Sequence, residues 1–272
     1  MRYKMQIAYD GSAFSGWQLQ PNAVSIQGEI EKALFTLLKK PVRVIGSGRT
    51  DAGTHAMGQV AHFDAEKMPS LLALNGILPK EIRILSLEET DDSFHAQYSA
   101  KGKTYHYHLW LEKVSDPFLY KYRYRVPFPI SLDLLHEAAQ AFVGTHDFTT
   151  FSNVGSSVKS SIRTIKRIDI VKQKGGVRLE FEGDGFLYKM VRNIVGTLLE
   201  VASHQNICIE ELLASRDRRA AGVCAPAHAL FLMEVDYGMS QCDETCHLAS
   251  QSPLETKQRS PKSPQLQTQV EH

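Results

Sequence analysis

The order of apolar and polar residues at the start of the chain predicts a β-strand. Over residues 3–9 the two kinds alternate, so every second side chain shares one face of a strand. That face is apolar and is expected to turn towards the core. Its side chains are Tyr3, Met5, Ile7 and Tyr9.

Three long helices are predicted further along. Ser25 and Ser131 are typical N-cap residues, and the apolar residues after each recur at the spacing of a single helical stripe. The helix after Ser131 is expected to run through Val143. The third long helix carries the apolar residues between 186 and 199.

Strands and short helices separate the long helices, and their order nearly repeats. Each half of the chain runs strand, helix, strand, strand, helix, strand, which favours an α+β fold. We expect two similar halves, residues 1–101 and 102–239, each an antiparallel (mixed) sheet with helices on one face, and an active-site cleft between them. The remaining predicted strands span 42–46, 58–64, 82–88, 104–110, 163–171, 177–182 and 229–236, and the short helices lie near 70–77 and 208–215.

Composition sets the last residues apart from the rest. The chain has 272 residues, of which 43% are apolar and 22% charged, as in globular proteins. Residues 240–272 contain no Phe, Trp or Tyr and are rich in Ser, Gln and Pro, so we expect a disordered tail. No apolar run is long enough to span a membrane, and the N-terminus lacks a signal-peptide pattern. A cytoplasmic protein is therefore expected.

The net charge of +1 hides two basic segments. Residues 159–178 hold seven basic side chains against one acid, Asp169, and residues 101–125 interleave six basic side chains with seven aromatic ones. This combination suits a polyanion whose bases can be stacked, such as RNA. A solvated strand face with ordinary core aromatics is the competing interpretation.

The densest polar segment is residues 46–59, which lies between two predicted strands and contains four glycines. It lacks the patterns of a phosphate loop or a dinucleotide fingerprint. Asp51 stands in its middle, between Arg49 and His55, and is the first catalytic candidate. A turn or cap acceptor is the alternative role for a lone Asp in a loop.

No metal site is predicted. Asp51, His55 and His62 match none of the compact metal-binding spacings. Near the end of the chain, Cys242 and Cys246 together with a following histidine lack a fourth ligand. The four cysteines are also too few and too clustered to staple a chain of this size.

Several separate motifs, in one order, resemble the bacterial tRNA pseudouridine synthases of the TruA type. The resemblance covers residues 1–238, and the tail belongs to none of the motifs. The matching segments are YDGSAFSGWQ at 9–18, GRTDAGTH at 48–55, KTYHY at 103–107, HDF at 146–148 and GFLYKMVRNIVG at 185–196.

The resemblance implies isomerisation of uridine to pseudouridine in the anticodon stem-loop of tRNA, in this family at positions 38, 39 and 40. The N1–C1′ bond breaks, the uracil rotates while held, and C5 bonds to C1′. Because the uracil is both leaving group and nucleophile, neither cofactor nor metal is implied. The resemblance also implies a homodimer in which one tRNA touches both subunits.

By the family's motifs, Asp51 is the essential carboxylate and Arg192 is its cationic partner, with a purely structural ion pair as the alternative for Arg192. A nearby guanidinium favours the ionised carboxylate that a nucleophile requires. Tyr105 matches the tyrosine that packs on the uracil, although a strand aromatic is otherwise plain core. Arg49 is similar to the arginine that fills the space left by the flipped nucleotide.

Two other classes compete with this interpretation. A non-catalytic RNA-binding or chaperone protein would use the same basic aromatic surface but has no need of Asp51 in a glycine-rich loop. A metal-dependent hydrolase using Asp51 and His55 would lose activity in chelator.

Overall fold

The computed structural model describes residues 1–153, 155, 160–203 and 207–238. Residues Met1–Tyr237 form one compact unit. The predicted tail, residues 240–272, lies outside the described residues, and so does the Cys242 and Cys246 segment.

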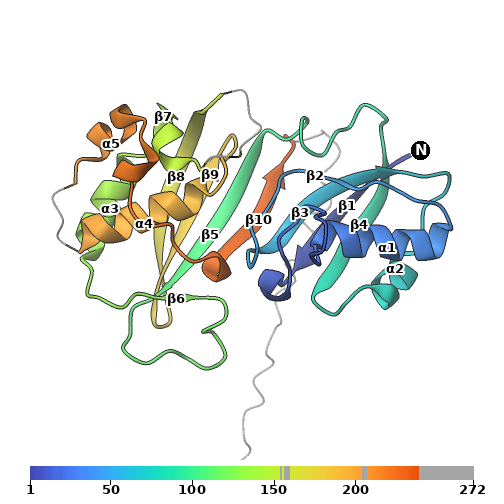
Figure 1. Ribbon diagram of the computed structural model, residues 1–272, viewed down its shortest axis with the longest axis horizontal. Coiled ribbons are helices and arrows are strands. Elements are labelled where there is room, and N and C mark those ends of the chain that lie inside the picture. The colour runs from blue at the N-terminus through green and yellow to red at the C-terminus, as the bar shows by residue number, and fades with distance from the viewer. Residues whose placement is uncertain (154, 156–159, 204–206, 239–272) are drawn as a thin grey trace, which may run out of the picture. The chain divides into compact units, whose positions relative to one another are not determined.

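One continuous mixed sheet runs through the compact unit (Figure 1). Its strand order is β4-β1-β3-β10-β5-β9-β8-β7, with β2 pairing β3 and β6 pairing β5. All pairs are antiparallel except β10 with β3 and β5 with β6. The strands are β1 (Arg2–Tyr9), β2 (Ile45–Gly46), β3 (His55–Asp64), β4 (Ile82–Thr90), β5 (Gly102–Trp110), β6 (Tyr124–Arg125), β7 (Gly144–Asp147), β8 (Ile162–Gln173), β9 (Gly176–Gly183) and β10 (Leu230–Asp236).

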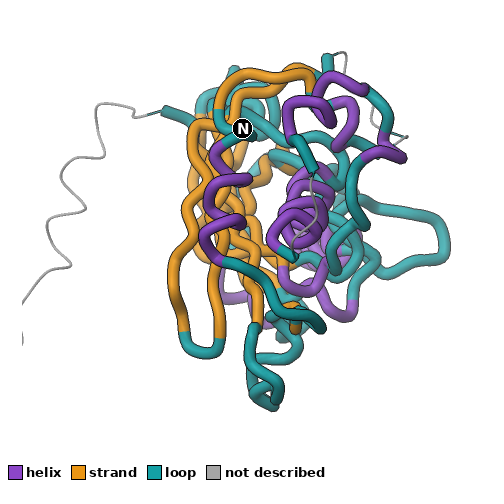
Figure 2. The backbone as a smooth tube through the Cα atoms, turned by 90° about the vertical axis from the view of Figure 1, so that its left-hand side faces the viewer, coloured by secondary structure: helices purple, strands orange, loops and turns teal. Residues whose placement is uncertain are grey.

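The helices pack mainly against one face of this sheet, and Figure 2 shows the strands as a single layer beside them. The predicted apolar face of β1 is buried, with Met5 and Ile7 fully inaccessible. The α+β class with helices on one face is thus confirmed. The helices are α1 (Ile26–Leu38), α2 (Leu71–Ile77), α3 (Leu132–Gln140), α4 (Met190–Ala202) and α5 (Ile209–Ser215).

The predicted serine caps are present. The Ser25 hydroxyl accepts a hydrogen bond from the Gly28 amide at the start of α1, and Ser131 Oγ accepts one from the Leu134 amide at the start of α3. Each bond satisfies an amide that has no partner within the helix.

Two helix boundaries differ from the prediction. α3 ends at Gln140 rather than Val143, because Gly144, with φ +118°, turns the chain into β7. α4 begins at Met190 rather than near 186, because Lys189 takes a left-handed conformation with φ 60° directly before it. The short strands β6 and β7 were not predicted.

The last strand, β10, lies in the middle of the sheet, between β3 and β5. It pairs in parallel with β3, where Leu232 faces Ala56, and antiparallel with β5, where Leu232 faces Tyr105. This strand therefore brings the N-terminal end of β3 close to Tyr105. The division into halves at residue 101 stays a prediction.

Candidate active site

Asp51 lies in the turn that connects β2 to β3, which we call the Asp51 loop (residues 47–54). Its Oδ2 accepts a hydrogen bond from Arg192 Nη1 at 2.5 Å. The two side chains are 18% and 14% exposed, so the pair is largely shielded from solvent. The structure thus joins two predicted residues that are 141 positions apart in sequence.

Arg192 is held from two sides. It belongs to the first turn of α4, and its Nε donates to the Ala225 carbonyl oxygen at 2.7 Å while Nη1 reaches Asp51. The Ala225 amide in turn donates to the Arg192 carbonyl oxygen at 3.1 Å. A guanidinium fixed in this way presents its charge to Asp51 in one orientation.

The segment that carries Ala225 is clamped against α4. Gly222 donates to Thr197 Oγ1 at 2.9 Å, and the Val223 amide donates to Glu200 Oε1 at 2.9 Å. Gly196 allows this close approach, since a Cβ added there would lie 1.7 Å from the Val223 carbonyl oxygen. Close packing therefore explains why Gly196, the last residue of the 185–196 motif, is a glycine.

Glycines also shape the Asp51 loop and its neighbour. Gly53 has φ +77°, and Gly16 has φ +89° with Asp51 backbone about 3.0 Å from the position of a Cβ. Tyr9 and Thr50 share a hydrogen bond between their hydroxyls at 2.8 Å. The N-terminal motif and the Asp51 motif thus pack directly on each other.

His55 anchors the end of the Asp51 loop. Its Nδ1 accepts from the Gly11 amide at 3.1 Å, and Nε2 lies 3.0 Å from the His228 carbonyl oxygen, which assigns the proton to Nε2. Burial lowers the pKa of His55, although the Asp10 carboxylate 3.1 Å away opposes this, so the ring is neutral at pH 7. Tyr122 donates to Asp10 Oδ2 at 2.8 Å.

Tyr105 lies on β5, with 8% of its surface exposed. Its ring meets Phe186 edge-on, with centroids 5.2 Å apart. Burial raises the pKa of Tyr105, and the negative charge of Asp51 adds to the rise. The phenol therefore stays protonated at physiological pH.

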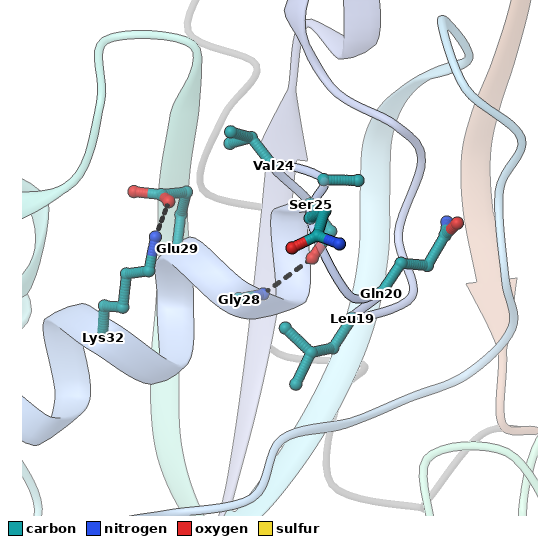
Figure 3. Close-up of a pocket in the computed structure, with 9 residues that line it drawn as sticks. Leu19, Gln20, Val24, Ser25, Gly28, Glu29 and Lys32 are labelled. Atoms are coloured by element: carbon teal, nitrogen blue, oxygen red, sulfur yellow. Dashed lines mark hydrogen bonds and ion pairs between the residues drawn. The ribbon is translucent and has the colours of Figure 1, made fainter.

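Arg49 is exposed, and its Nε donates to Gln18 Oε1 at 3.1 Å. The structure gives no contact between Arg49 and the Asp51–Arg192 pair. A surface pocket of about 340 Å³ lies next to this contact and is lined by Leu19, Val24 and Gly28 among others (Figure 3). Asp51 and Arg192 are not among its lining residues.

The structure also reveals residues that the sequence did not indicate. The sequence indicates His55 only as a possible metal ligand. In the structure both of its ring nitrogens contact backbone groups instead. Tyr122 belongs to the basic aromatic segment 101–125, which gave no sign that it reaches Asp10. Among the described residues, no three His, Cys, Asp or Glu side chains are grouped so as to hold a metal.

Comparison with known proteins agrees with the motifs. The family model described as tRNA pseudouridine synthase matches residues 5–99 and 138–238. The "tRNA pseudouridine synthase A 1" of Protochlamydia amoebophila is 53% identical over 245 residues, covering 86% of this chain and 96% of that protein. The "tRNA pseudouridine synthase A" of an Exiguobacterium species is 43% identical over 242 residues, covering 87% of this chain and 98% of that protein.

The fold, the motifs and these matches together define an RNA-modifying isomerase of the pseudouridine synthase class. The chain belongs to the tRNA pseudouridine synthase family. A solved "Cbf5-Nop10-Gar1 Complex" is 13% identical with a TM-score of 0.35, covering 73% of this chain and 46% of that chain, and no argument rests on it.

Proposed function

We propose that the protein converts uridine to pseudouridine in the anticodon stem-loop of tRNA, with Asp51 as the nucleophile. The observation that carries this proposal is the shielded Asp51–Arg192 ion pair, whose Nη1–Oδ2 distance is 2.5 Å. The names of the relatives support tRNA as the substrate. The stem-loop and the role of Asp51 come from the motif resemblance.

The reaction exchanges one bond to C1′ for another. The N1–C1′ bond breaks, the uracil turns in place, and C5 bonds to C1′. The C5 proton is then lost, and N1 gains a proton, so the product is an isomer of the substrate. Asp51 attacks either the sugar or the base, and for both routes it has to be ionised, which the Arg192 charge favours.

Tyr105 packs on the uracil in this proposal. Its ring is fixed by Phe186, and the raised pKa keeps its hydroxyl protonated, so it can donate a hydrogen bond to the base. A nucleotide in the anticodon arm has to leave its stack to reach these residues, at a cost of a few kcal/mol. Arg49, which is exposed beside Gln18, fills the vacated space.

The rest of the proposal concerns partners and place. Phosphates contact basic side chains of segments 101–125 and 159–178, and these contacts fix position rather than read sequence. Residues 1–101 and 102–239 form the two walls of the RNA cleft, and the protein acts as a homodimer in the cytoplasm, where tRNA is found. Among the described residues, no helix is both long and apolar enough for a membrane span.

The test uses unmodified tRNA with tritium at uridine C5. Wild-type protein should release the label, because the C5–C1′ bond forms only if that hydrogen leaves. A matched tRNA whose anticodon-arm uridines are replaced by cytidines should release far less. Tight binding without release would favour an RNA-binding protein instead, and equal release from both tRNAs would contradict the anticodon arm as the target.

A further inference from the structure

Lys103 belongs to the basic segment 101–125, and its amine lies beside the Asp51 loop. It stands two residues before Tyr105 on β5, so both side chains share the face that carries the site. Lys103 Nζ donates to the Ser47 carbonyl oxygen at 2.9 Å. Gly48 leaves room for the amine, since a Cβ there would lie 2.5 Å from Nζ.

Within the described part of the chain, no carboxylate lies at ion-pair distance from Lys103 Nζ. Neighbouring strands present Gly183 and Val235 opposite Lys103. Of the acids beside these two residues, Glu182 and Glu234 pair with Thr104 and Asp236 pairs with Gly102, so all three point to the other face of the sheet. The fourth, Asp184, accepts a hydrogen bond from the Thr164 amide.

Arg163 supplies a second positive charge on the same face of the sheet. Gly183 pairs with both Lys103 and Ile165, and Arg163 stands two residues before Ile165. Burial, together with the charge of Arg163, lowers the pKa of Lys103 to about 8. Arg163 Nη1 donates to the Ser160 carbonyl at 3.0 Å and to the Ile162 carbonyl, and it too forms no ion pair with a described residue. Its Nε lies 3.5 Å from where a Cβ of Gly185 would be, directly before the Phe186 that packs on Tyr105.

Several other cations of the same sheet are paired with acids. Lys166 and Arg167 pair with Glu182, and Arg178 pairs with Glu180. Lys103 and Arg163 instead donate to carbonyl oxygens and form no ion pair with a described residue. Half-buried like charges repel each other, and an anion between them would relieve that repulsion.

We propose that Lys103 and Arg163 bind one phosphate group of the RNA backbone next to the nucleotide that reaches Asp51. This site rests on the function proposed above and adds a contact to it. Lys103 borders the loop that carries Asp51, and Arg163 borders the turn that carries Phe186, so a phosphate held by both lies at the edge of the site. The phosphate fixes the backbone from which the nucleotide flips.

The first test measures binding of unmodified tRNA across a series of KCl concentrations. All variants carry Asp51→Asn, so that no product forms. Lys103→Gln and Arg163→Gln should each weaken binding by roughly tenfold, at the lower end of what a charge-assisted hydrogen bond contributes. Each should also reduce the slope of log K against log salt by about 0.7–0.9.

Matched controls remove a charge that already has a partner. Lys40 and Arg219 pair with Glu66 and Asp217, outside both basic segments. Lys40→Gln and Arg219→Gln should leave the affinity and the slope unchanged. If Lys103→Gln and Arg163→Gln behave like these controls, the phosphate site is wrong.

The second test uses pH and separates binding from a structural role of Lys103. An amine with a pKa of about 8 is charged at pH 7 and neutral at pH 9, so the phosphate contact weakens over this range. If the contact strengthens binding tenfold, the affinity of the protein that keeps Lys103 should fall about fivefold more between pH 7 and pH 9 than that of Lys103→Arg, which stays charged. Identical pH profiles would overturn the proposal.

If Lys103→Gln fails to fold, both tests can still be made. Arg163→Gln keeps the Lys103 amine for the salt series, and Lys103→Arg keeps a positive charge at this position for the pH series. Failure of the proposed function has a different signature. In that case wild-type protein would release no tritium from C5, whatever the salt slopes of the variants. Normal release with unchanged slopes would remove the phosphate site alone.

Discussion

Replacing Arg192 with Met removes the charge that faces Asp51 while keeping much of the apolar stem. The Nη1–Oδ2 distance of 2.5 Å puts the charge centres about 4 Å apart. At an effective dielectric constant of about 20 the attraction between them is about 4 kcal/mol. Partial exposure and desolvation reduce this value, and we expect a coupling of about 2–3 kcal/mol.

Two assays measure that coupling. Urea unfolding of the wild type, Arg192→Met, Asp51→Asn and the double variant gives it as a free energy of unfolding. Single-turnover release of C5 tritium should slow by roughly 30- to 150-fold in Arg192→Met, which corresponds to the same 2–3 kcal/mol. Arg192→Lys should fall in between, because one ammonium cannot reproduce the two directed bonds to Ala225 and Asp51.

A matched control is Arg219→Met, which removes an exposed arginine that pairs with Asp217. No measurable coupling to Asp217 is expected, because exposed pairs contribute little. A normal single-turnover rate in Arg192→Met, with a coupling as small as in the control pair, would refute the role of the ion pair.

Three further predictions concern packing, the tail and metals. Gly196→Ala should destabilise the protein by about 2–3 kcal/mol and slow turnover, since its Cβ would strike the Val223 carbonyl; Gly76→Ala, with open space in α2, should not destabilise it. Removing residues 240–272 should leave the melting temperature and turnover unchanged, and a large drop in either would show that the tail packs. Activity should survive excess chelator when Mg²⁺ is supplied only to fold the tRNA; recovery only after added zinc would favour the hydrolase.

Much of the fold followed from local signals. The Ser25 and Ser131 caps and the apolar stripes located the helices, because a cap and a stripe depend on residues close together in sequence. The ends of α3 and α4 were missed, since they depend on the backbone conformations of Gly144 and Lys189. The two-residue strand β6 exists only because a distant strand pairs with it.

The candidate site, like the fold, could be predicted only where a short stretch of sequence carries a signal. Motif resemblance indicated Asp51, Arg192 and Tyr105, and the structure joins the first two in an ion pair. The motifs could not indicate the support from His55 or the Ala225 carbonyl, because these contacts join segments more than 30 residues apart and leave no periodic pattern. The sequence likewise could not single out Lys103, because the contacts of its amine are made with residues distant in sequence.

The most direct measurement compares Asp51→Asn with the wild type on one preparation of unmodified, C5-tritiated tRNA. Asparagine keeps the size of the side chain but cannot act as a carboxylate nucleophile. Single-turnover release should fall by at least about a thousandfold, a loss of about 4 kcal/mol, while tRNA affinity stays within about threefold because phosphate contacts supply most of it. Substantial release by a pure, folded Asp51→Asn protein would contradict Asp51 as the nucleophile.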